Sequence, residues 1–299
     1  SAMVWALLLL GAGGCAAAGL NMERLDYDTP VDSVLQAGLV RIDATLRARY
    51  GLAPEQASVG LLDLRTGRLA TLHPDLEFYA ASVPKIAILL AYFQLHPGAA
   101  THLDTATRHE LGLMIKASSN ELATKYARQM GLKPIQQVLD SYHLYEAARG
   151  GGLWMGKYYG QGGDRFGDPV ADHSHAATVR QLLRFYLLLE QGRLVSPAAS
   201  KTMLEIFASP DIPPENIKFV RGLAGRPVQI LSKSGSWEDW LHDTAIITGP
   251  GRRYILVGLT HHPKGDDYLA DLAAAADDLM LREAGSSTSG NSGAGGARH

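Results

Sequence analysis

The sequence predicts an α+β fold: an antiparallel β-sheet with flanking helices and an inserted all-helical subdomain. Three observations predict it. Short apolar runs bounded by turn residues lie near both ends of the chain, segments with helical periodicity fill the middle, and an amphipathic segment lies outside the strands at each end. The chain has 299 residues, of which 46% are hydrophobic, so it is long enough to bury a sizeable core. Strands from the two ends complete one sheet only if they pair with each other.

The individual elements follow the chain in order. Apolar residues at helical spacing predict a helix over 31–50, which Gly51 ends. Two short runs on either side of the turn at 65–68 predict a hairpin. The remaining predictions are helices over 82–95, 121–130, 134–142, 176–190, 197–207 and 266–283, and strands over 227–232, 243–248 and 254–260.

The chain divides into four predicted regions. Residues 1–15 form a leader, 16–30 a linker, 31–284 one catalytic domain and 285–299 a disordered tail, since the tail is rich in Gly, Ser and Asn and has no apolar residue larger than Ala. Within the domain, the α/β part covers about 31–82 and 222–284, and the helical part covers about 83–221.

The leader contains an apolar run from Met3 to Leu10, which is shorter than the roughly 20 residues that a membrane span needs. Small residues and then Cys15 follow it. This order is typical of a secretory signal, and with a cysteine at the end it resembles the lipobox of bacterial lipoproteins. We therefore expect export to the periplasm or cell envelope, with Cys15 as the lipid attachment point and a possible membrane tether. The alternative is a disordered leader with an incidental cysteine.

Composition excludes several classes of function. The 28 Lys and Arg residues nearly balance the 30 Asp and Glu residues, so no basic surface suggests a nucleic-acid partner. A single cysteine excludes a disulfide scaffold and any site that needs several thiolates. His173 with His175, and His261 with His262, are candidate metal ligands but lack a recognisable third partner. We expect no metal, no cofactor, no nucleic acid and a monomer.

The first motif with chemical meaning is Ser82-Val83-Pro84-Lys85. A Ser and a Lys three residues apart lie on one face of a helix, so the amine reaches the hydroxyl. The N-terminal end of a helix also favours a developing anion. Alone the pattern is weak, because an N-cap Ser followed by a surface Lys gives it too. Lys85 is nevertheless the only one of nine lysines that has a Ser at this spacing.

Two further motifs occur downstream of the first. Ser118-Ser119-Asn120 lies after the apolar run Leu111–Ile115 and before a predicted helix, where an ordinary helix cap would also place Ser and Asn. Lys233-Ser234-Gly235-Ser236 follows an apolar strand, where the glycine admits a ligand backbone and the lysine adds a positive charge. An edge strand that runs into a turn is the alternative.

Ser-x-x-Lys, Ser-x-Asn and Lys-Ser/Thr-Gly in this order are the signature of the penicillin-recognising serine enzymes. The chain resembles class A β-lactamases and related penicillin-binding proteins over about residues 31–281. The second motif begins with Ser, whereas class C enzymes have Tyr at that position. This difference places the chain nearer to class A. The resemblance implies an exported serine hydrolase of the β-lactamase type.

The resemblance also implies a role for each motif residue. Ser82 is the nucleophile that forms the acyl-enzyme, and Lys85 is its base, whose pKa burial and the charge of Lys233 lower. Ser118 relays a proton to the leaving nitrogen, and Asn120 holds the substrate amide. The backbone N–H groups of Ser82 and Ser236 form the oxyanion hole. The carboxylate of the substrate is bound by Lys233, Ser234 and Ser236, and Gly235 is a further substrate-binding residue.

One expected residue is missing. Class A enzymes hydrolyse the acyl-enzyme with a water that a Glu activates, yet no Glu occurs between Glu146 and Glu190. Residues 150–167 contain eight glycines together with Trp154, Tyr158, Tyr159 and Phe166. This segment is either a floppy surface loop or a flap whose aromatic residues touch substrate. The only carboxylates available in the region are Asp164, Asp168 and Asp172, and Asp172 also fits a structural role at the base of the loop.

A second departure lies after the third motif. The acidic and aromatic segment 237–240 replaces a basic residue that class A enzymes use for the substrate carboxylate, and it favours a ligand with a cationic group unless it is merely surface. Arg221 and Arg226 are candidates for the missing charge. The predicted partner is a β-lactam or a D-Ala-type peptide. Hydrolysis of β-lactams, with slow deacylation, is the leading function. The alternatives are a D-Ala-D-Ala carboxypeptidase-like enzyme, a sensor without turnover, and an esterase.

Overall fold

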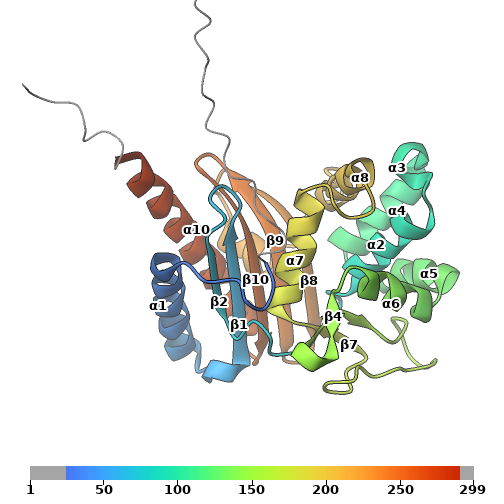
Figure 1. Cartoon of the computed structure of the whole chain (residues 1–299), viewed down its shortest axis with the longest axis horizontal. Coiled ribbons are helices and arrows are strands. Elements are labelled where there is room, and N and C mark those ends of the chain that lie inside the picture. Colours follow the sequence, from blue (N-terminus) through green and yellow to red (C-terminus); the bar gives the residue numbers. More distant parts are fainter. Residues whose placement is uncertain (1–24, 290–299) are drawn as a thin grey trace, which may run out of the picture.

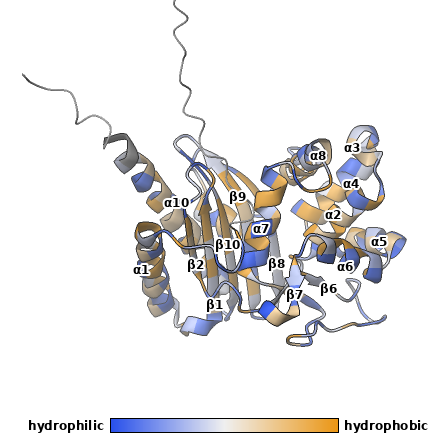
Figure 2. Cartoon of the chain, viewed as in Figure 1, coloured by the Kyte–Doolittle hydropathy of each residue, from blue (hydrophilic) through white to orange (hydrophobic). Residues whose placement is uncertain are grey.

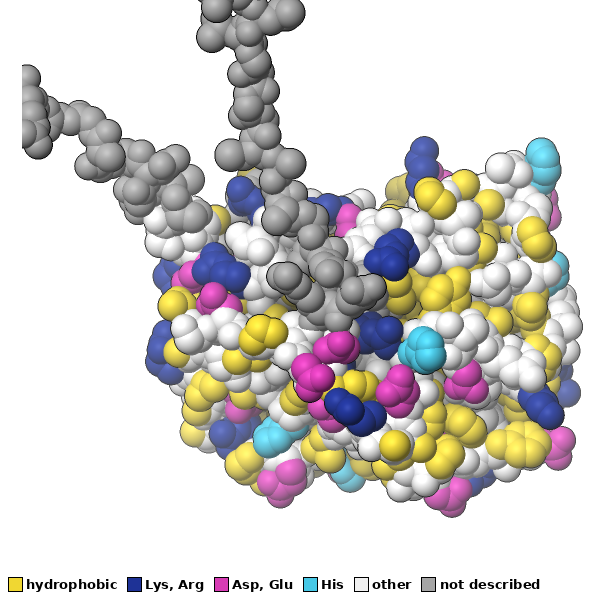
Figure 3. Space-filling model, in the orientation of Figure 1, with side chains coloured by type: hydrophobic (Ala, Val, Ile, Leu, Met, Phe, Trp, Pro, Cys, Tyr) yellow, Lys and Arg dark blue, Asp and Glu magenta, His cyan; other side chains and the backbone are white. Residues whose placement is uncertain are grey.

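The computed structural model describes residues 25–289 of the chain (Figure 1). The predicted leader with Cys15, most of the predicted linker and residues 290–299 lie outside the described residues. No helix within 25–289 is both long enough and apolar enough to span a membrane. On the face drawn in Figure 3, acidic and basic side chains are interspersed, in keeping with the near balance of charge in the sequence.

One five-stranded antiparallel sheet forms the centre of the molecule, in the order β2-β1-β10-β9-β8. Strand β1, from the N-terminal part, pairs with β10, from the C-terminal part, in the register Ala57↔Thr260 to Asp63↔Tyr254. The two ends of the chain therefore complete one sheet, which confirms the predicted fold class. The strands are β1 (Ala57–Asp63), β2 (Leu69–Leu72), β8 (Gln229–Trp237), β9 (Trp240–Gly249) and β10 (Arg252–His261).

Helices α1 (Ser33–Tyr50) and α10 (Gly265–Ser289) cover one face of the sheet, at the left of Figure 1. Alternate strand residues such as Val59, Leu61 and Leu256 point to this face and join a core with both helices. The apolar bands appear as orange segments of strands and helices in Figure 2. Helix α10 continues to Ser289, so the predicted end of the domain at 284 falls inside a helix.

Helix α7 (Val179–Glu190) packs on the opposite face, against β1 and β10. A Cβ at Gly60 would lie 2.6 Å from a methyl of Val179 and 2.7 Å from a methyl of Leu183, so only glycine allows the helix this close to β1. Helix α9 (Lys218–Gly222) packs against α10. Both helices fall mainly inside the predicted helical part, 83–221, and both contact strands of the sheet.

The helical part lies beyond β8, at the right of Figure 1. It buries apolar side chains in a core that continues onto the α7 face of the sheet. Its helices are α2 (Lys85–Leu95), α3 (Ala99–His102), α4 (Thr105–Lys116), α5 (Asn120–Met130), α6 (Leu132–Ser141) and α8 (Pro197–Ala208). Two small sheets lie below it: β3 (Phe78–Tyr79), β7 (His175–Ala177) and β6 (Trp154–Met155), and β4 (Tyr145–Glu146) with β5 (Gly151–Gly152). Short 3₁₀ turns are η2 (Pro54–Gln56) and η3 (Ala147–Arg149).

Three predicted boundaries differ from the structure for physical reasons. The chain makes turns through 81–84 and helix α2 begins at Lys85, so Ser82 precedes the helix. The predicted helix 176–190 begins as strand β7, because Ala176 pairs with Tyr79 and Trp154. The predicted strand 227–232 runs on to Trp237, because pairing with β9 extends to Trp240. That extension places the third motif inside a strand.

Candidate active site

Ser82 lies in the tight turn between β3 and α2. The residue before it, Ala81, has a φ of +50°, an uncommon left-handed conformation that aims the turn at β8. A Cβ at Gly235 would lie 2.7 Å from the carbonyl oxygen of Ala80 and 3.1 Å from the nitrogen of Ser82. The glycine of the third motif therefore leaves room for the turn that carries Ser82. This contact brings the segments that carry Ser82 and Ser236 together, while their oxyanion role stays a prediction.

Lys85 is fully buried in the first turn of α2, and its amine joins the first two motifs. The Nζ atom lies 3.1 Å from the Ser82 hydroxyl, the distance that proton transfer between them requires. It also lies 3.1 Å from Ser118 Oγ, 2.6 Å from the Ser118 carbonyl oxygen and 2.7 Å from Asn120 Oδ1. The structure thus brings together four residues that the sequence places up to 38 positions apart.

Ser118 joins Lys85 to the third motif. Its hydroxyl accepts a hydrogen bond from Lys233 Nζ at 3.0 Å, so it lies between two lysine amines. Ser118 has a φ of +56°, an uncommon left-handed conformation for a non-glycine residue, which costs on the order of 1–3 kcal/mol and is concentrated at functional sites. Lys233 also donates to the Ser234 carbonyl oxygen at 2.6 Å. Ser82, Lys85, Ser118 and Lys233 therefore form a continuous chain of polar contacts.

Burial shifts the pKa of both amines in the direction that a base requires. Burial lowers the pKa of Lys85 to about 7, and the negative charge of Glu215 opposes the change. Burial also holds the pKa of Lys233 well below its usual range, and the charges of Lys85 and Lys218 add to the effect. Near neutral pH, a large share of Lys85 is therefore unprotonated and able to accept a proton from Ser82.

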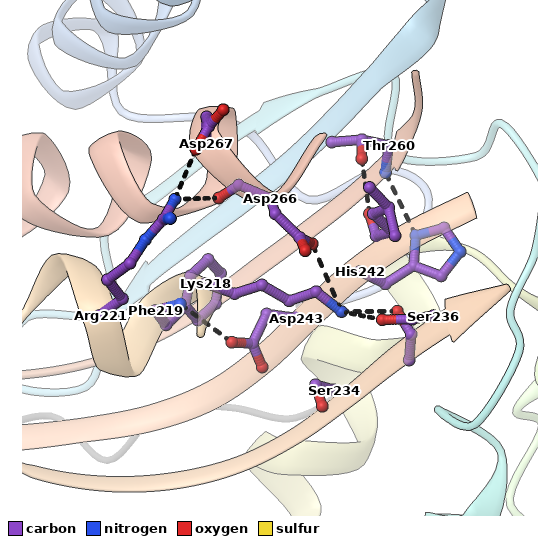
Figure 4. A network of polar contacts seen from close by, with 12 residues as sticks. Lys218, Phe219, Arg221, Ser234, Ser236, His242, Asp243, Thr260, Asp266 and Asp267 are labelled. Carbon is purple, nitrogen blue, oxygen red and sulfur yellow. Dashed lines mark hydrogen bonds and ion pairs between the residues drawn. The ribbon is translucent and has the colours of Figure 1, made fainter. Parts of the chain in front are cut away.

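Lys218 is a site residue that the sequence did not reveal. It opens α9 with a φ of +50°, and its side chain is fully buried. Its amine donates to Ser236 Oγ at 2.6 Å and to the Gly235 carbonyl oxygen at 2.8 Å, and Asp266 lies 3.8 Å away (Figure 4). Asp243 holds the adjoining backbone by accepting from the Phe219 N–H at 3.1 Å.

Lys218 occupies the place that Arg221 and Arg226 were predicted to fill. Arg221 binds Asp267 at 2.8 Å, and Arg226 binds Asp277 and Asp278 at 3.0 and 2.7 Å, so both arginines are engaged on the α10 side. Lysine is common in every kind of segment, and nothing near position 218 resembles a motif. Only the folded chain brings this lysine to the third motif.

The glycine-rich segment 150–167 reaches the active site through Tyr159. The ring centroid of Tyr159 lies 4.6 Å from Lys85 Nζ, and its hydroxyl donates to the Ala81 carbonyl oxygen at 2.9 Å. Two other aromatic residues of the segment contact its surroundings: Trp154 tilts against Tyr145, and Tyr158 lies under Arg128. One aromatic residue of the segment therefore faces the amine of Lys85.

The three aspartates considered for deacylation are engaged elsewhere or exposed. Asp168 is buried and accepts from the Tyr145 hydroxyl at 2.8 Å and from the His173 N–H at 2.6 Å. Asp172 pairs with Arg165 at 3.2 Å and its side chain is 82% exposed. Asp164 is exposed. Among the described residues, the hydrogen-bond partners of Ser82 and Lys85 include no carboxylate.

Asp168 instead belongs to a buried carboxyl pair. Burial and a hydrogen bond to Asp168 raise the pKa of Glu77 to about 9, so Glu77 is protonated at neutral pH. Burial works to raise the pKa of Asp168, but hydrogen bonds from Glu77 and Tyr145 lower it overall. A Cβ at Gly151 would lie 1.8 Å from Glu77 Oε2, so the glycine segment closes directly over the pair. The pair fixes the base of the segment.

Replacing Glu77 with Gln is expected to weaken the pH dependence of stability. Glu77 holds its proton in the folded state up to about pH 9 and loses it near pH 4.5 when unfolded, so wild-type stability falls as pH rises between these values. The amide of the Gln side chain would donate the same hydrogen bond to Asp168 at every pH. Thermal melts at pH 6 and pH 9 should show a smaller fall in Tm for E77Q, by a few degrees. Parallel curves for the two proteins would contradict the assignment.

Three of the four histidines considered as metal ligands contact aromatic rings. His173 packs edge-on to Tyr79 and Trp240, and His175 stacks on Tyr159 with ring centroids 4.5 Å apart. His261 stacks on Trp240 at 3.5 Å. Within residues 25–289, no group of three or more His, Cys, Asp and Glu side chains is arranged to hold a metal ion.

Comparisons with known proteins agree with this fold. The sequence profile of the beta-lactamase enzyme family matches residues 100–280, more than half of the chain. The fold is similar to that of the β-lactamase from Sphaerobacter thermophilus, with 19% identity, a TM-score of 0.65, and coverage of 82% of this chain and 97% of that one. No curated protein matches the chain in sequence.

Two other solved structures share the fold. The class A β-lactamase from Mycobacterium abscessus is 16% identical, with a TM-score of 0.65 and coverage of 81% of this chain and 99% of that one. A PBP-A variant, solved as an acyl-enzyme complex with penicillin G, is 17% identical, with a TM-score of 0.63 and coverage of 82% and 97%. The fold is thus shared with β-lactamases and with PBP-A.

Proposed function

Because the chain belongs to the beta-lactamase enzyme family, we propose that it is a serine hydrolase in which Ser82 forms an acyl-enzyme with β-lactams. The observation that carries the proposal is the contact chain from Ser82 through Lys85 and Ser118 to Lys233. It joins a nucleophile, a base with a lowered pKa and a proton relay, with partly buried hydroxyls and buried amines, which is the constellation that acyl transfer needs.

The proposed acylation follows from these distances. Ser82 Oγ attacks the lactam carbonyl carbon while its proton moves to neutral Lys85 Nζ, 3.1 Å away. The C–N bond of the lactam then breaks, and the leaving nitrogen takes a proton from Ser118 Oγ. Lys85 returns its proton to Ser118 across the 3.1 Å contact between them. The oxyanion that forms meanwhile is stabilised by the backbone N–H groups of Ser82 and Ser236.

An anionic substrate suits the far end of the site. Lys218 and Lys233 both lie beside the third motif: Lys218 donates to the Ser236 hydroxyl and Lys233 to the Ser234 carbonyl oxygen. Penicillins and peptides that end in D-Ala-D-Ala both carry a carboxylate. The PBP-A variant is an acyl-enzyme with penicillin G, which supports a penicillin as the probe for this site.

Deacylation is proposed to be slow. No carboxylate among the described residues contacts Ser82 or Lys85, so the acyl-enzyme lacks the acidic base that class A enzymes use. This observation favours a second candidate, a penicillin-binding enzyme of the D-Ala-D-Ala carboxypeptidase type, which penicillin would acylate and hold. We also propose that the protein is exported and tethered to the membrane through Cys15. This part of the proposal rests on the sequence of residues 1–15.

The test is to add benzylpenicillin and follow the intact mass of the protein and the concentration of the drug over time. A covalent adduct is the expected result. An adduct that disappears while the drug is consumed indicates a β-lactamase, and a lasting adduct indicates the penicillin-binding enzyme. Absence of any adduct, together with hydrolysis of simple esters, would overturn the proposal in favour of an esterase.

A further inference from the structure

Tyr159 is held against the catalytic amine from three directions. Its hydroxyl donates to the Ala81 carbonyl oxygen at 2.9 Å, and its own carbonyl oxygen accepts from Thr124 Oγ1 at 2.5 Å. Its ring stacks on His175 with centroids 4.5 Å apart, and His175 is itself fixed by a 2.9 Å contact with the Lys157 carbonyl oxygen. These contacts come from three different parts of the fold, so together they fix the position of the ring.

The amine of Lys85 is surrounded by protein atoms and is not exposed to solvent. A neutral amine has two N–H groups and one lone pair, and a charged one has three N–H groups. Four oxygens lie within 3.1 Å of Nζ, which already exceeds that number. The Tyr159 ring lies 4.6 Å from Nζ and covers a further direction. A water beside Lys85 would therefore have to displace either a motif oxygen or the ring.

Tyr159 itself is unsuited to activate a water. Burial raises the pKa of its hydroxyl well above the usual range, so the phenol keeps its proton at any pH at which the protein works. That proton is donated to the Ala81 carbonyl oxygen. A group that is neutral and already donating its only proton is a poor general base. The contribution of Tyr159 to hydrolysis is therefore steric.

We propose that the Tyr159 ring excludes water from the Lys85 side of the acyl-enzyme and thereby prolongs its lifetime. In deacylation, water adds to the ester carbonyl and gives a proton to a base, and Ser82 Oγ then leaves and is reprotonated. Lys85 is the one base in contact with Ser82 among the described residues, and the ring fills the approach to it. The inference rests on the proposed acyl-enzyme and assigns what limits its breakdown.

The test compares Tyr159→Ala with the matched control Tyr159→Phe. Each protein is acylated with benzylpenicillin, excess drug is removed, and the loss of the adduct is followed by intact mass. The Ala variant should lose its adduct about tenfold faster or more, which corresponds to opening a path for water beside Lys85. The Phe variant keeps the ring and loses only the hydrogen bond to Ala81, so its adduct lifetime should stay much closer to wild type than that of the Ala variant. Acylation rates of all three should agree within a few fold.

A second measurement separates shielding from a general loosening of the fold. Without the ring, water reaches Lys85 and reduces its desolvation, so the midpoint of the acylation rate against pH should move upward in the Ala variant only. Thr124→Val, which removes the hydrogen bond to the Tyr159 carbonyl, should shorten the lifetime in the same direction and by less. This variant also serves if Tyr159→Ala does not fold.

The outcomes distinguish the two proposals. An adduct whose lifetime is the same in wild type and in Tyr159→Ala overturns the shielding role and leaves the acyl-enzyme intact. Equal shortening in the Phe and Ala variants also overturns it, since the hydroxyl rather than the ring would then be responsible. If no variant forms an adduct, the proposed function itself is wrong.

Discussion

Replacing Ser82 with Ala is expected to abolish the benzylpenicillin adduct. Two hydroxyls among the described residues lie 3.1 Å from the buried amine of Lys85, and only that of Ser82 belongs to the turn held against Gly235. Loss of a serine nucleophile from a comparable unit lowers turnover by about a millionfold. Intact mass after incubation with benzylpenicillin measures the effect, and the variant should show only the mass of the unmodified chain.

A matched control is Ser141→Ala, which removes an exposed serine at the end of α6, outside the site. Ser141 donates to the Val138 carbonyl oxygen, so its loss changes one local hydrogen bond. This variant should form the adduct at the wild-type rate. An adduct that persists in Ser82→Ala would show that another group is the nucleophile and would remove the basis of the proposed mechanism.

Replacing Lys85 with Met is expected to give the second largest loss. Met has a similar length and no basic group, so Ser82 loses the acceptor for its proton, and acylation should slow by about 10²–10⁴-fold. Lys85→Arg is the informative companion, because it keeps the charge but stays protonated and cannot act as a base. Both variants should acylate slowly. An Arg variant with wild-type activity would mean that charge alone is required at this position.

The same assignment fixes the pH profile of the wild-type protein. Burial lowers the pKa of Lys85 to about 7, so below that pH the amine is protonated and unable to accept a proton. The acylation rate should therefore rise with pH through about 7 and level off above it. Acylation rates measured by rapid mixing and intact mass, on both sides of this pKa, check the expectation. A rate that falls as the pH rises would contradict the role of Lys85 as base.

The fold class was predictable because hydrophobic periodicity is a local property. The pairing of β1 with β10 followed from apolar runs near both ends of the chain, and the spacing of apolar residues located most helices. The boundaries of α2 and β7 depended on partners far away in the sequence. Ala176 has helical neighbours in sequence, but it pairs with Tyr79 and Trp154 in other strands.

The motif residues were predictable for a different reason: their chemistry fixes their spacing and order. Lys218 and Tyr159 were not, because each reaches the site through tertiary contacts that leave no local trace. Lys218 follows an ordinary turn, and Tyr159 is one of several aromatic residues in a glycine-rich segment. In the sequence the segment stands out only by its lack of Glu and by its many glycines. That Gly151 closes over Glu77, and that one ring turns toward Lys85, required the folded chain.

Three lysines, Lys85, Lys218 and Lys233, are buried around one site, and burial disfavours the charged form of each. Desolvation of these amines lowers the free energy of unfolding, and burial of apolar side chains in the two cores must offset that cost. The protein's tolerance of destabilising substitutions elsewhere in the chain is correspondingly reduced. An anionic ligand at these amines binds the folded state alone and restores part of that margin. The three buried amines that the proposed activity uses therefore also limit how many destabilising substitutions the protein can accept.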